Sequence, residues 1–468
     1  MRYISTRGRA IALGFEDVLM TGLARDGGLY VPEHYPELNG KEIAGFAGRP
    51  YQEVAVDIMS RFMGGAVPLQ ELVEIVRRAY ERFEHKLVAP LQSIGADEFV
   101  LELFRGPTLA FKDIAMQVLA GLMDRTLRKR KSRATIVGAT SGDTGAAAIE
   151  AFRGMSAVDV FILYPEGRIS EVQRRQMTTP TEANVHAIAI KGTFDDCQSM
   201  LKAMFNDLEL RDRLQLSGVN SINWARLMVQ IVYYFTGAVA AGAPDRRVTF
   251  SVPTGNFGDI FAGYVALRMG LPIRRLIIAT NVNDILVRTL ETGRYEPRDV
   301  VATSSPSMDI QLASNFERLL FELAGRKAGR VRELMEDLAR KGSFTLNEAE
   351  LKAFRARFSA VKVDETEMAR VMAETRAQSR YVADPHTAVG IAAARRVPRE
   401  KGVPVVTLAT AHPSKFAEAV RAAIGGDPLE PTIITRQRHL PERRTVLPND
   451  LRQVVDYITE HARAGASR

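Results

Sequence analysis

The sequence predicts an α/β protein in which a parallel sheet is covered by helices. From about Gly95 onward, short apolar runs alternate with helical segments, and this alternation is typical of βαβ units. The chain has 468 residues, of which 46% are hydrophobic and 25% charged, close to the averages of globular proteins. Collagen-like, disordered and disulfide-framework proteins are therefore excluded, and the length favours about three domains.

Six apolar runs are the expected strands of this sheet. Runs of this kind, rich in Val, Ile, Leu and Ala, are expected where parallel strands are buried on both faces. They span residues 134–137, 158–163, 186–190, 248–252, 275–279 and 403–409.

Three other regions differ from this alternating pattern. The first ninety or so residues contain short turns and an amphipathic helix near residues 68–83. Between residues 314 and 376 the strands stop and a charged amphipathic helical pattern takes over, which predicts a helical insertion. The proline-rich end predicts a surface strap followed by a short last helix.

Cysteine content and hydropathy limit the compartment. Cys197 is the only cysteine, so neither an internal disulfide nor a cysteine-based zinc cluster can form, and a reducing cytoplasm fits best. The first twenty residues lack the apolar stretch of a secretory signal, so export is not expected. Residues 225–243 are strongly apolar, but Arg226 and Gln230 interrupt them, which predicts a buried core helix and no membrane span.

The net charge of +8 favours anionic ligands, either small phosphates or nucleic acid. The densest basic run, residues 125–133, follows an apolar helical segment, so we expect a solvated helix end whose cations oppose the helix dipole. No aromatic residues interleave with this run to stack bases. A nucleic-acid partner is therefore not expected.

Several common catalytic motifs are absent from the chain. It contains neither a GxxxxGK[ST] phosphate loop nor a GxGxxG fingerprint, and it lacks both GxSxG and HExxH. Its seven histidines are scattered, so no metal site is expected. P-loop ATPases, dehydrogenases of the usual fingerprint, serine hydrolases and zincins are poor matches.

Three strand-to-helix turns rich in small residues are candidate anion sites. Residues 137–148 and 251–263 each place glycines and hydroxyl residues between an apolar strand and a helix, where backbone N–H groups and the helix dipole favour a phosphate or carboxylate. Either turn alone could reflect only tight-turn sterics, but we expect the two in one sheet, which favours ligand binding. The third, residues 407–415, ends in a hydroxyl, a histidine and a lysine.

Lys112 is the candidate nucleophile. The helical stretch after Pro107 carries apolar residues on nearly every face, which predicts a helix buried all round. A lysine on such a helix has to be paired with an anion or serve in catalysis, and burial lowers its pKa toward the value that a nucleophilic amine needs. The alternative is an exposed lysine near the helix start.

Arg226 is the candidate for a second anion site. It lies on the apolar segment that follows Asn220 and Ser221. A buried arginine has to pair with an anion, and its planar guanidinium can bind a phosphate through two hydrogen bonds. A structural ion pair with a carboxylate is the alternative.

Four segments, in this order along the chain, resemble the threonine synthase family. They are FRGPTLAFKD around Lys112, ATSGDTGAA around Asp143, VPTGNFGD around Gly255 and LATAHPSKF around Thr410. The opening RYISTRG and LARDGGLYVPE are similar to the N-terminal region of the bacterial and fungal branch. The resemblance covers nearly the whole chain.

This resemblance implies pyridoxal-phosphate fold type II, the tryptophan synthase β-like fold with two α/β lobes and the cofactor between them. It also implies conversion of O-phospho-L-homoserine and water to L-threonine and phosphate. The expected parts are an N-terminal domain, the catalytic core, the helical insertion, and the end of the core with the C-terminal strap. They span residues 1–90, 91–313, 314–376 and 377–468.

The resemblance also assigns roles in binding pyridoxal phosphate. Lys112 is implied to be the Schiff-base lysine, and Thr410 to face the pyridine nitrogen with a neutral hydroxyl that keeps the ring a mild electron sink. Asp143 stands where many relatives have Asn; beside the phenolate oxygen of the ring, its carboxylate would have to share a proton or turn away. The residues implied to cradle the cofactor phosphate are Gly255, Asn256, Phe257 and Gly258.

The substrate is implied to be held by two further groups. The turn from Thr140 to Thr144, which includes Ser141, resembles the loop that binds the substrate carboxylate in this fold. The phosphate of the substrate is expected to bind the NSxNxxR residues Asn220, Ser221, Asn223 and Arg226.

The residues and the resemblance imply the same chemistry. A buried amine forms an imine, the ring takes up the electrons left by the α proton, phosphate leaves from the γ carbon and water adds at the β carbon. Lys112, released by the substrate, is the expected proton shuttle.

Several alternatives remain open from the sequence. A phospho-lyase that stops after elimination and releases a 2-keto acid is the nearest rival, and a dehydratase would not need the second anion site at Arg226. The expected partner is a small molecule, with neither nucleic acid nor a membrane. The oligomeric state, with a monomer as one option, the role of the insertion and the roles of His412 and Lys415 stay open.

Overall fold

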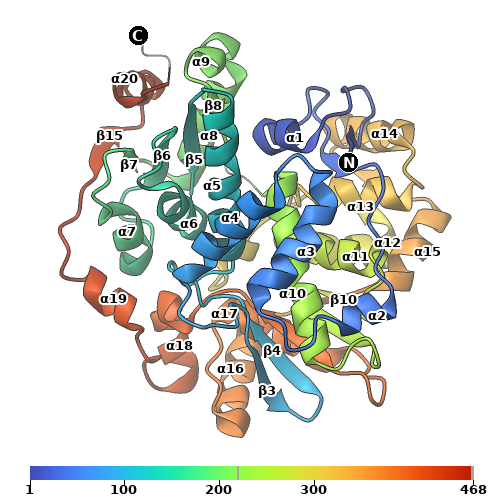
Figure 1. The fold of residues 1–468 in the computed structure, drawn as a ribbon. Helices are drawn as coiled ribbons and strands as arrows, with labels where there is room; N and C mark the ends of the chain where they lie inside the picture. Colours follow the sequence, from blue (N-terminus) through green and yellow to red (C-terminus); the bar gives the residue numbers. More distant parts are fainter. Residues whose placement is uncertain (141, 219–220, 465–468) are drawn as a thin grey trace.

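The computed structural model describes residues 1–140, 142–218 and 221–464, and in these residues two separate sheets form the framework (Figure 1). The smaller sheet has five strands in the order β15-β7-β6-β5-β8, all parallel. Its strand β6, VDVFILYP, is buried along its whole length because helices cover both faces. The strands are β5 (Ala134–Ala139), β6 (Val158–Pro165), β7 (Val185–Lys191), β8 (Leu216–Ser217) and β15 (Thr445–Pro448).

The larger sheet has six strands in the order β13-β10-β9-β14-β4-β3. Adjacent strands in this sheet are parallel, except for β3 and β4, which form an antiparallel pair at one edge. The strands are β3 (Leu91–Gly95), β4 (Glu98–Glu102), β9 (Val248–Pro253), β10 (Ile273–Thr280), β13 (Phe358–Lys362) and β14 (Val405–Ala409). The six apolar runs expected from the sequence are therefore strands, but they divide between two sheets.

Helices cover the sheets and fill the space between them. Their ends follow local signals, such as the capping boxes at Ser170 and Thr193 that begin α7 and α8. The helices of the first half are α1 (Phe15–Thr21), α2 (Gly40–Ala44), α3 (Tyr51–Met63), α4 (Leu69–Glu81), α5 (Lys112–Lys129), α6 (Asp143–Phe152), α7 (Glu171–Thr178), α8 (Phe194–Asn206), α9 (Leu208–Arg213) and α10 (Trp224–Ala240).

As far as residue 464, the second half contributes ten further α-helices and two short 3₁₀ helices. They are α11 (Gly258–Arg268), α12 (Ile285–Thr292), η1 (Pro306–Met308), α13 (Phe316–Leu323), α14 (Ala328–Lys341), α15 (Glu348–Arg357), α16 (Glu365–Ser379), α17 (Pro385–Arg396), η2 (Pro413–Phe416), α18 (Ala417–Ile424), α19 (Thr432–Gln437) and α20 (Leu451–His461).

The N-terminal region packs directly on the core helices. Strands β1 (Tyr3–Ser5) and β2 (Tyr30–Pro32) form an antiparallel pair, while α3 contacts α10 and α4 contacts α5. The Tyr3 ring lies 5.9 Å from the Trp224 ring of α10, and Tyr3 Oη donates a 2.7 Å hydrogen bond to the carbonyl of Phe62. The amphipathic helix expected near residues 68–83 is α4, which buries Leu72, Val76, Ala79 and Tyr80.

The apolar segment 225–243 is a core helix, as predicted. Helix α10 is buried over most of its length and contacts α3, α5 and α11. Among the described residues, no helix combines the length and the apolar character needed to cross a bilayer.

The basic run at the end of α5 is exposed but not merely solvated. Arg125 contacts Glu16 and Glu71, Lys129 donates to Glu16 Oε1 at 2.9 Å, and Arg130 contacts Asp17. The end of α5 is thus held against the acidic first turn of α1, a tertiary contact that the local charge pattern does not encode.

One expectation about the second half was wrong. The strands do not stop between residues 314 and 376: β13 lies there and pairs with β10 at the edge of the larger sheet, and β12 (Phe344–Thr345) pairs with β11 (Arg294–Tyr295). The five residues of β13 follow α15 directly, without a turn residue to separate them, so the charged helical pattern concealed them.

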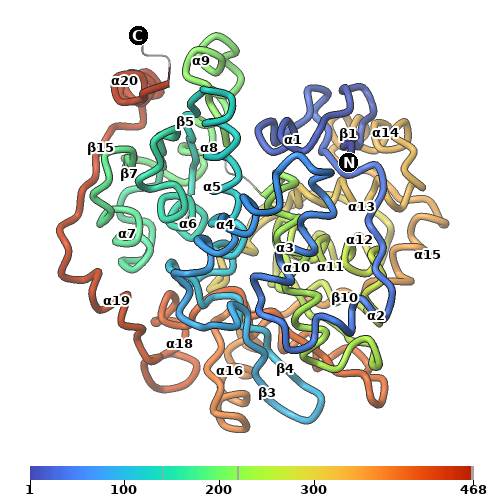
Figure 2. The backbone as a smooth tube through the Cα atoms, viewed as in Figure 1, coloured from blue at the N-terminus to red at the C-terminus, as the bar shows by residue number. Residues whose placement is uncertain are grey.

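The C-terminal strap contains a strand as well as a helix. Residues 445–448 form β15, which pairs in parallel with β7 and extends the smaller sheet (Figure 2). Two of its four residues, Val446 and Pro448, are exposed, which is why composition alone suggested only a surface segment.

The buried side chain of Asn184 forms hydrogen bonds with the backbone of the loop between α6 and β6. Its Nδ2 donates to the carbonyls of Phe152 and Val158, both at 2.9 Å, and its Oδ1 accepts from Gly154 N at 2.8 Å. We expect Asn184→Ala to lower the free energy of unfolding by about 3 kcal/mol, because buried carbonyls lose their donor.

The matched control removes an asparagine that is exposed. Asn347→Ala deletes the N-cap of α15 and should cost about 1 kcal/mol. Urea denaturation followed by circular dichroism measures both variants. Equal losses for the two would contradict the role given to Asn184.

Candidate active site

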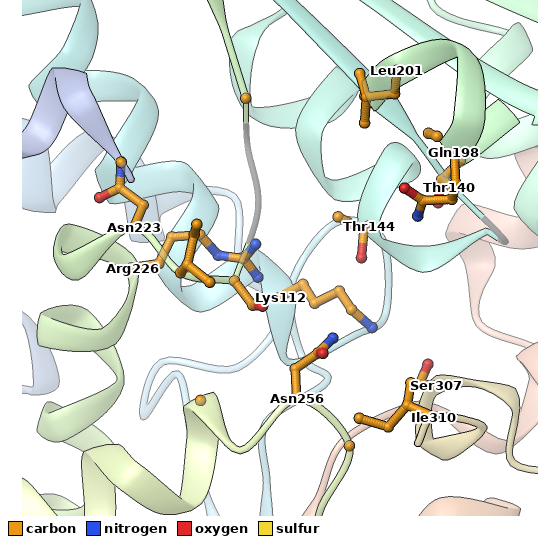
Figure 3. A pocket seen from close by; sticks show the side chains of 18 of the residues that line it. Lys112, Thr140, Thr144, Gln198, Leu201, Asn223, Arg226, Asn256, Ser307 and Ile310 are labelled. Atoms are coloured by element: carbon orange, nitrogen blue, oxygen red, sulfur yellow. The ribbon is translucent and has the colours of Figure 1, made fainter. Parts of the chain in front are cut away.

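A pocket with a volume of about 1080 Å³ lies between the two sheets. The carboxyl ends of β5 and β9 open into it, as expected for ligand sites of parallel α/β sheets. The starts of α5 and α10 and residues of α8 complete its wall (Figure 3). The two glycine-rich turns were expected in one sheet; they belong to different sheets and meet across this pocket.

Lys112 is the first residue of α5 and is buried, as the apolar helix predicted. The segment before it is fixed by the end of β14: Phe111 N donates to the Thr410 carbonyl at 2.8 Å, and Ala110 bridges Ala411. Figure 3 shows the side chain of Lys112 pointing into the pocket near Thr144 and Asn256. Burial lowers the pKa of the Lys112 ammonium, so the neutral, nucleophilic amine is favoured.

Asp143 begins α6 and faces Lys112. Its Oδ2 lies 3.5 Å from Lys112 Nζ, and its Oδ1 lies 2.8 Å from Nζ of Lys415. Burial alone would raise the pKa of Asp143, but the two lysines hold it well below its usual range. Asp143 is therefore an ionised carboxylate, engaged by cations of its own chain.

The β5–α6 turn is organised by a threonine hydroxyl. Thr140 Oγ1 accepts hydrogen bonds from Gly142 N at 2.9 Å and Gly145 N at 3.0 Å, so its O–H can still donate outward. Thr144 follows on α6 and lines the pocket. Ser141, the remaining predicted member of this turn, lies outside the described residues.

The β9–α11 turn presents the start of a helix to the pocket. Phe257 adopts a left-handed conformation with φ of 64° before Gly258 begins α11, and no described side chain caps this helix. The free N–H groups at such a start suit a phosphate. A Cβ at Gly255 would lie 2.5 Å from the Ser307 carbonyl oxygen, so the turn has no room for a side chain there.

Asn315 holds this turn against the neighbouring segment. Its backbone N donates to the Asn256 carbonyl at 3.0 Å, and its Nδ2 donates to the carbonyls of Asn256 and Ser221, both at 3.2 Å. Gly255, Asn256, Phe257 and Gly258 all line the pocket.

Arg226 reaches the pocket from the first turn of α10. It is buried, and burial lowers the pKa of its guanidinium to about 10. Ser221 and Asn223 also line the pocket, while Asn220 lies outside the described residues.

The carboxamide of Asn223 is engaged within the protein. Its Oδ1 accepts from Ala225 N at 2.9 Å as the N-cap of α10, and its Nδ2 donates to the Leu19 carbonyl at 2.9 Å. Its side chain therefore fixes the start of α10 to the N-terminal region.

Thr410 follows β14 and lines the pocket with a buried side chain. The same turn places Lys415 beside Asp143, although the sequence left its role open. Two supporting residues were not predicted at all: Gln173, whose Nε2 donates to Asp143 Oδ1 at 2.9 Å, and Asn315. The lysine at the end of a strand-to-helix turn was a usable signal for Lys415, whereas Gln173 and Asn315 lie in segments without a motif.

Three family models match the chain. They are described as "Threonine synthase N terminus" over residues 2–80, "Pyridoxal-phosphate dependent enzyme" over residues 86–410 and "Threonine synthase, C-terminal" over residues 387–458. A threonine synthase of Pseudomonas aeruginosa is 51% identical over 99% of both chains.

Two solved structures share the fold over nearly the full length. The pyridoxal-phosphate-bound threonine synthase of Brucella melitensis has a TM-score of 0.97 at 56% identity and covers 99% of this chain and all of its own. The yeast threonine synthase has a TM-score of 0.94 at 38% identity and covers 98% of each chain.

Proposed function

Because this chain belongs to the threonine synthase family, we propose that its pocket converts O-phospho-L-homoserine and water to L-threonine and phosphate. The chain is a pyridoxal-phosphate-dependent lyase. The observation that carries the proposal is that a buried amine, Lys112, lines one pocket together with two separate candidate anion sites, the β9–α11 turn and Arg226. Both the cofactor and the substrate bear a phosphate, so two surfaces are needed.

Pyridoxal phosphate, when bound, accepts the electrons left when the α proton of the substrate is removed. The residues present fit it: Lys112 supplies the amine for covalent attachment, and the uncapped start of α11 supplies backbone donors for its phosphate. Thr410 is proposed to meet the pyridine nitrogen with a neutral hydroxyl. The Thr410 carbonyl also accepts a hydrogen bond from Phe111 N, next to Lys112. The residue proposed to meet the pyridine nitrogen and the residue proposed to attach the cofactor would therefore be held together by this hydrogen bond.

The substrate is proposed to be oriented by its carboxylate and its phosphate. Thr140 can donate its O–H to the substrate carboxylate because its oxygen accepts hydrogen bonds from the start of α6. Thr144, which lines the pocket, and Ser141 are proposed to bind the same carboxylate. Arg226, with Ser221 and Asn220, is proposed to bind the phosphate. Asn223 is proposed to act indirectly, by capping the helix that carries Arg226.

Lys112 is also the proposed proton carrier. Its Nζ points into the pocket, and burial favours the neutral amine, which can take a proton from a substrate carbon and return it. The family to which the chain belongs supports hydration to threonine over release of a keto acid.

The two-lobed arrangement supports pyridoxal-phosphate fold type II, with the cofactor between the sheets. The buried thiol of Cys197 is compatible with a reducing compartment, and we propose that the enzyme acts in the cytoplasm on a small-molecule substrate. A monomer and the domain boundaries given above remain predictions.

Product analysis tests the proposed reaction. Purified holoenzyme incubated with O-phospho-L-homoserine should yield threonine and inorganic phosphate in equal amounts. Accumulation of a 2-keto acid in place of threonine would show a phospho-lyase instead.

Lys112→Ala is expected to abolish turnover while the fold stays intact, because the linkage needs a primary amine and alanine preserves the helix. Borohydride reduction of the wild-type holoenzyme, followed by peptide mapping, identifies the attached lysine. A pyridoxyl group on another lysine would overturn the assignment.

Gly255→Ala is expected to weaken cofactor binding at least tenfold, since its Cβ would meet the Ser307 carbonyl and shift the turn. Gly426→Ala is the matched control, because a Cβ there meets nothing within 4 Å. Fluorescence titration of the apoenzymes measures both affinities. Wild-type affinity in Gly255→Ala would argue against this phosphate site.

Arg226→Ala should lower kcat/KM for O-phospho-L-homoserine by roughly tenfold to a hundredfold, because a charge-assisted contact is worth about 1.5 to 3 kcal/mol. Arg226→Lys should recover only part of this, since an ammonium lacks the planar fork. Cofactor absorbance should be unchanged. An Arg226→Ala protein that lacks cofactor but keeps its kinetics per bound cofactor would assign Arg226 to the cofactor instead.

A further inference from the structure

Two buried lysines share the carboxylate of Asp143, which lines the pocket. Asp143 Oδ1 lies 2.8 Å from Lys415 Nζ, and Asp143 Oδ2 lies 3.5 Å from Lys112 Nζ. The side chains of Lys415 and Asp143 are 0% and 4% exposed, so water does not screen this contact. The closer cation is therefore the lysine to which the proposed reaction gives no role.

Lys415 is held in place by acceptors from two elements. Besides Asp143 of α6, it donates to the Thr108 carbonyl at 2.7 Å, in the segment that leads into α5. Gln173 of α7 donates to the same Asp143 oxygen at 2.9 Å. These contacts orient the carboxylate so that Oδ1 meets Lys415 and Gln173 while Oδ2 faces Lys112.

The charges around Lys112 oppose one another. Burial lowers the pKa of Lys112, Asp143 raises it, and Lys415 and Arg226 lower it. Without Lys415, the carboxylate of Asp143 would act on Lys112 alone and favour its ammonium form.

Other titratable groups also face this cluster. Asp113 of α5 feels the charge of Lys415, and burial raises the pKa of Asp113 to about 6. His412, the N-cap of η2, is also near Lys415, and burial lowers its pKa to about 4. His386 of α17 lines the same pocket. None of these is the group that pairs with Lys415.

We propose that Lys415 is a positioning residue for Lys112. It neutralises and orients Asp143, and this keeps the ε-amino group of Lys112 from being held as the ammonium partner of that carboxylate. The proposal rests on Lys112 being the lysine that binds the cofactor.

Absorbance titration of the holoenzyme tests the proposal without relying on activity. The visible band of the lysine-bound cofactor changes as the linkage at Lys112 gains or loses its proton. In Lys415→Met the uncompensated carboxylate should favour the protonated linkage and move the midpoint upward by about one pH unit. Asp143→Asn should move it downward, because two cations then lack their carboxylate.

The double variant Asp143→Asn/Lys415→Met separates charge from packing. It removes Asp143 and Lys415 as charges together, so neither is left buried without the other, and it should fold even if Lys415→Met does not. Its midpoint should lie above that of Asp143→Asn and close to wild type. A merely structural role for Lys415 would instead leave the double variant equal to Asp143→Asn.

The rate of cofactor attachment to the apoenzyme is the second measurement. At pH 7, Lys415→Met should load pyridoxal phosphate more slowly, by up to about tenfold for an upward shift of one unit in the pKa of the free Lys112 amine, because less of that amine is neutral. Lys129→Met, which removes a positive charge from the far end of α5, should change neither the rate nor the midpoint.

Each failure has a distinct meaning. A midpoint in Lys415→Met that is unchanged or lowered, or a double variant equal to Asp143→Asn, would overturn the role of Lys415. If the wild-type protein forms no visible lysine-bound band at all, the proposed cofactor site at Lys112 fails first.

Discussion

The pocket depends on how buried positive charge is balanced between the two sheets. Lys112 and Lys415 share the carboxylate of Asp143, and Arg226 is buried on the adjoining helix. Cations removed from water are costly unless they meet anions. Within the described residues, Asp143 lies closer to Lys415 than to Lys112, so Lys415 already balances the carboxylate when the amine of Lys112 is neutral. The proposed chemistry at Lys112 depends on this pairing.

The fold supplies this balance by bringing distant segments together. Lys112, Asp143, Arg226 and Lys415 come from α5, α6, α10 and η2. The two glycine-rich turns end strands of different sheets and face the same space. Backbone contacts fix the geometry: Thr410 holds the residue before Lys112, and Asn315 ties the β9–α11 turn to the segment that leads to Arg226. A site assembled in this way can hold two phosphates apart.

Much of this could be predicted from sequence, for identifiable reasons. Apolar runs such as those of β6 and β9 carry their own signal because parallel strands are buried on both faces. Lys112 and Arg226 stood out as charges on apolar helices. Strand β13 was not predicted, because five residues directly after a charged helix carry too little hydrophobic pattern. Strand β15 was not predicted either, because half of its residues are exposed. The apolar runs alone did not divide the strands between two sheets, since strand order depends on tertiary pairing; only the family resemblance implied two lobes. The pairing of Asp143 with Lys415 could be identified only from the structure, because the two residues are 272 positions apart in the sequence.

We infer that one pocket holds two phosphates at separate places, with Lys112 between them. A crystal structure of the holoenzyme with an unreactive phosphonate analogue of the substrate would show both groups. We expect the cofactor phosphate at the turn of residues 255–258 and the phosphonate at Arg226. A phosphonate bound at that turn, or a cofactor phosphate bound by Arg226, would contradict it.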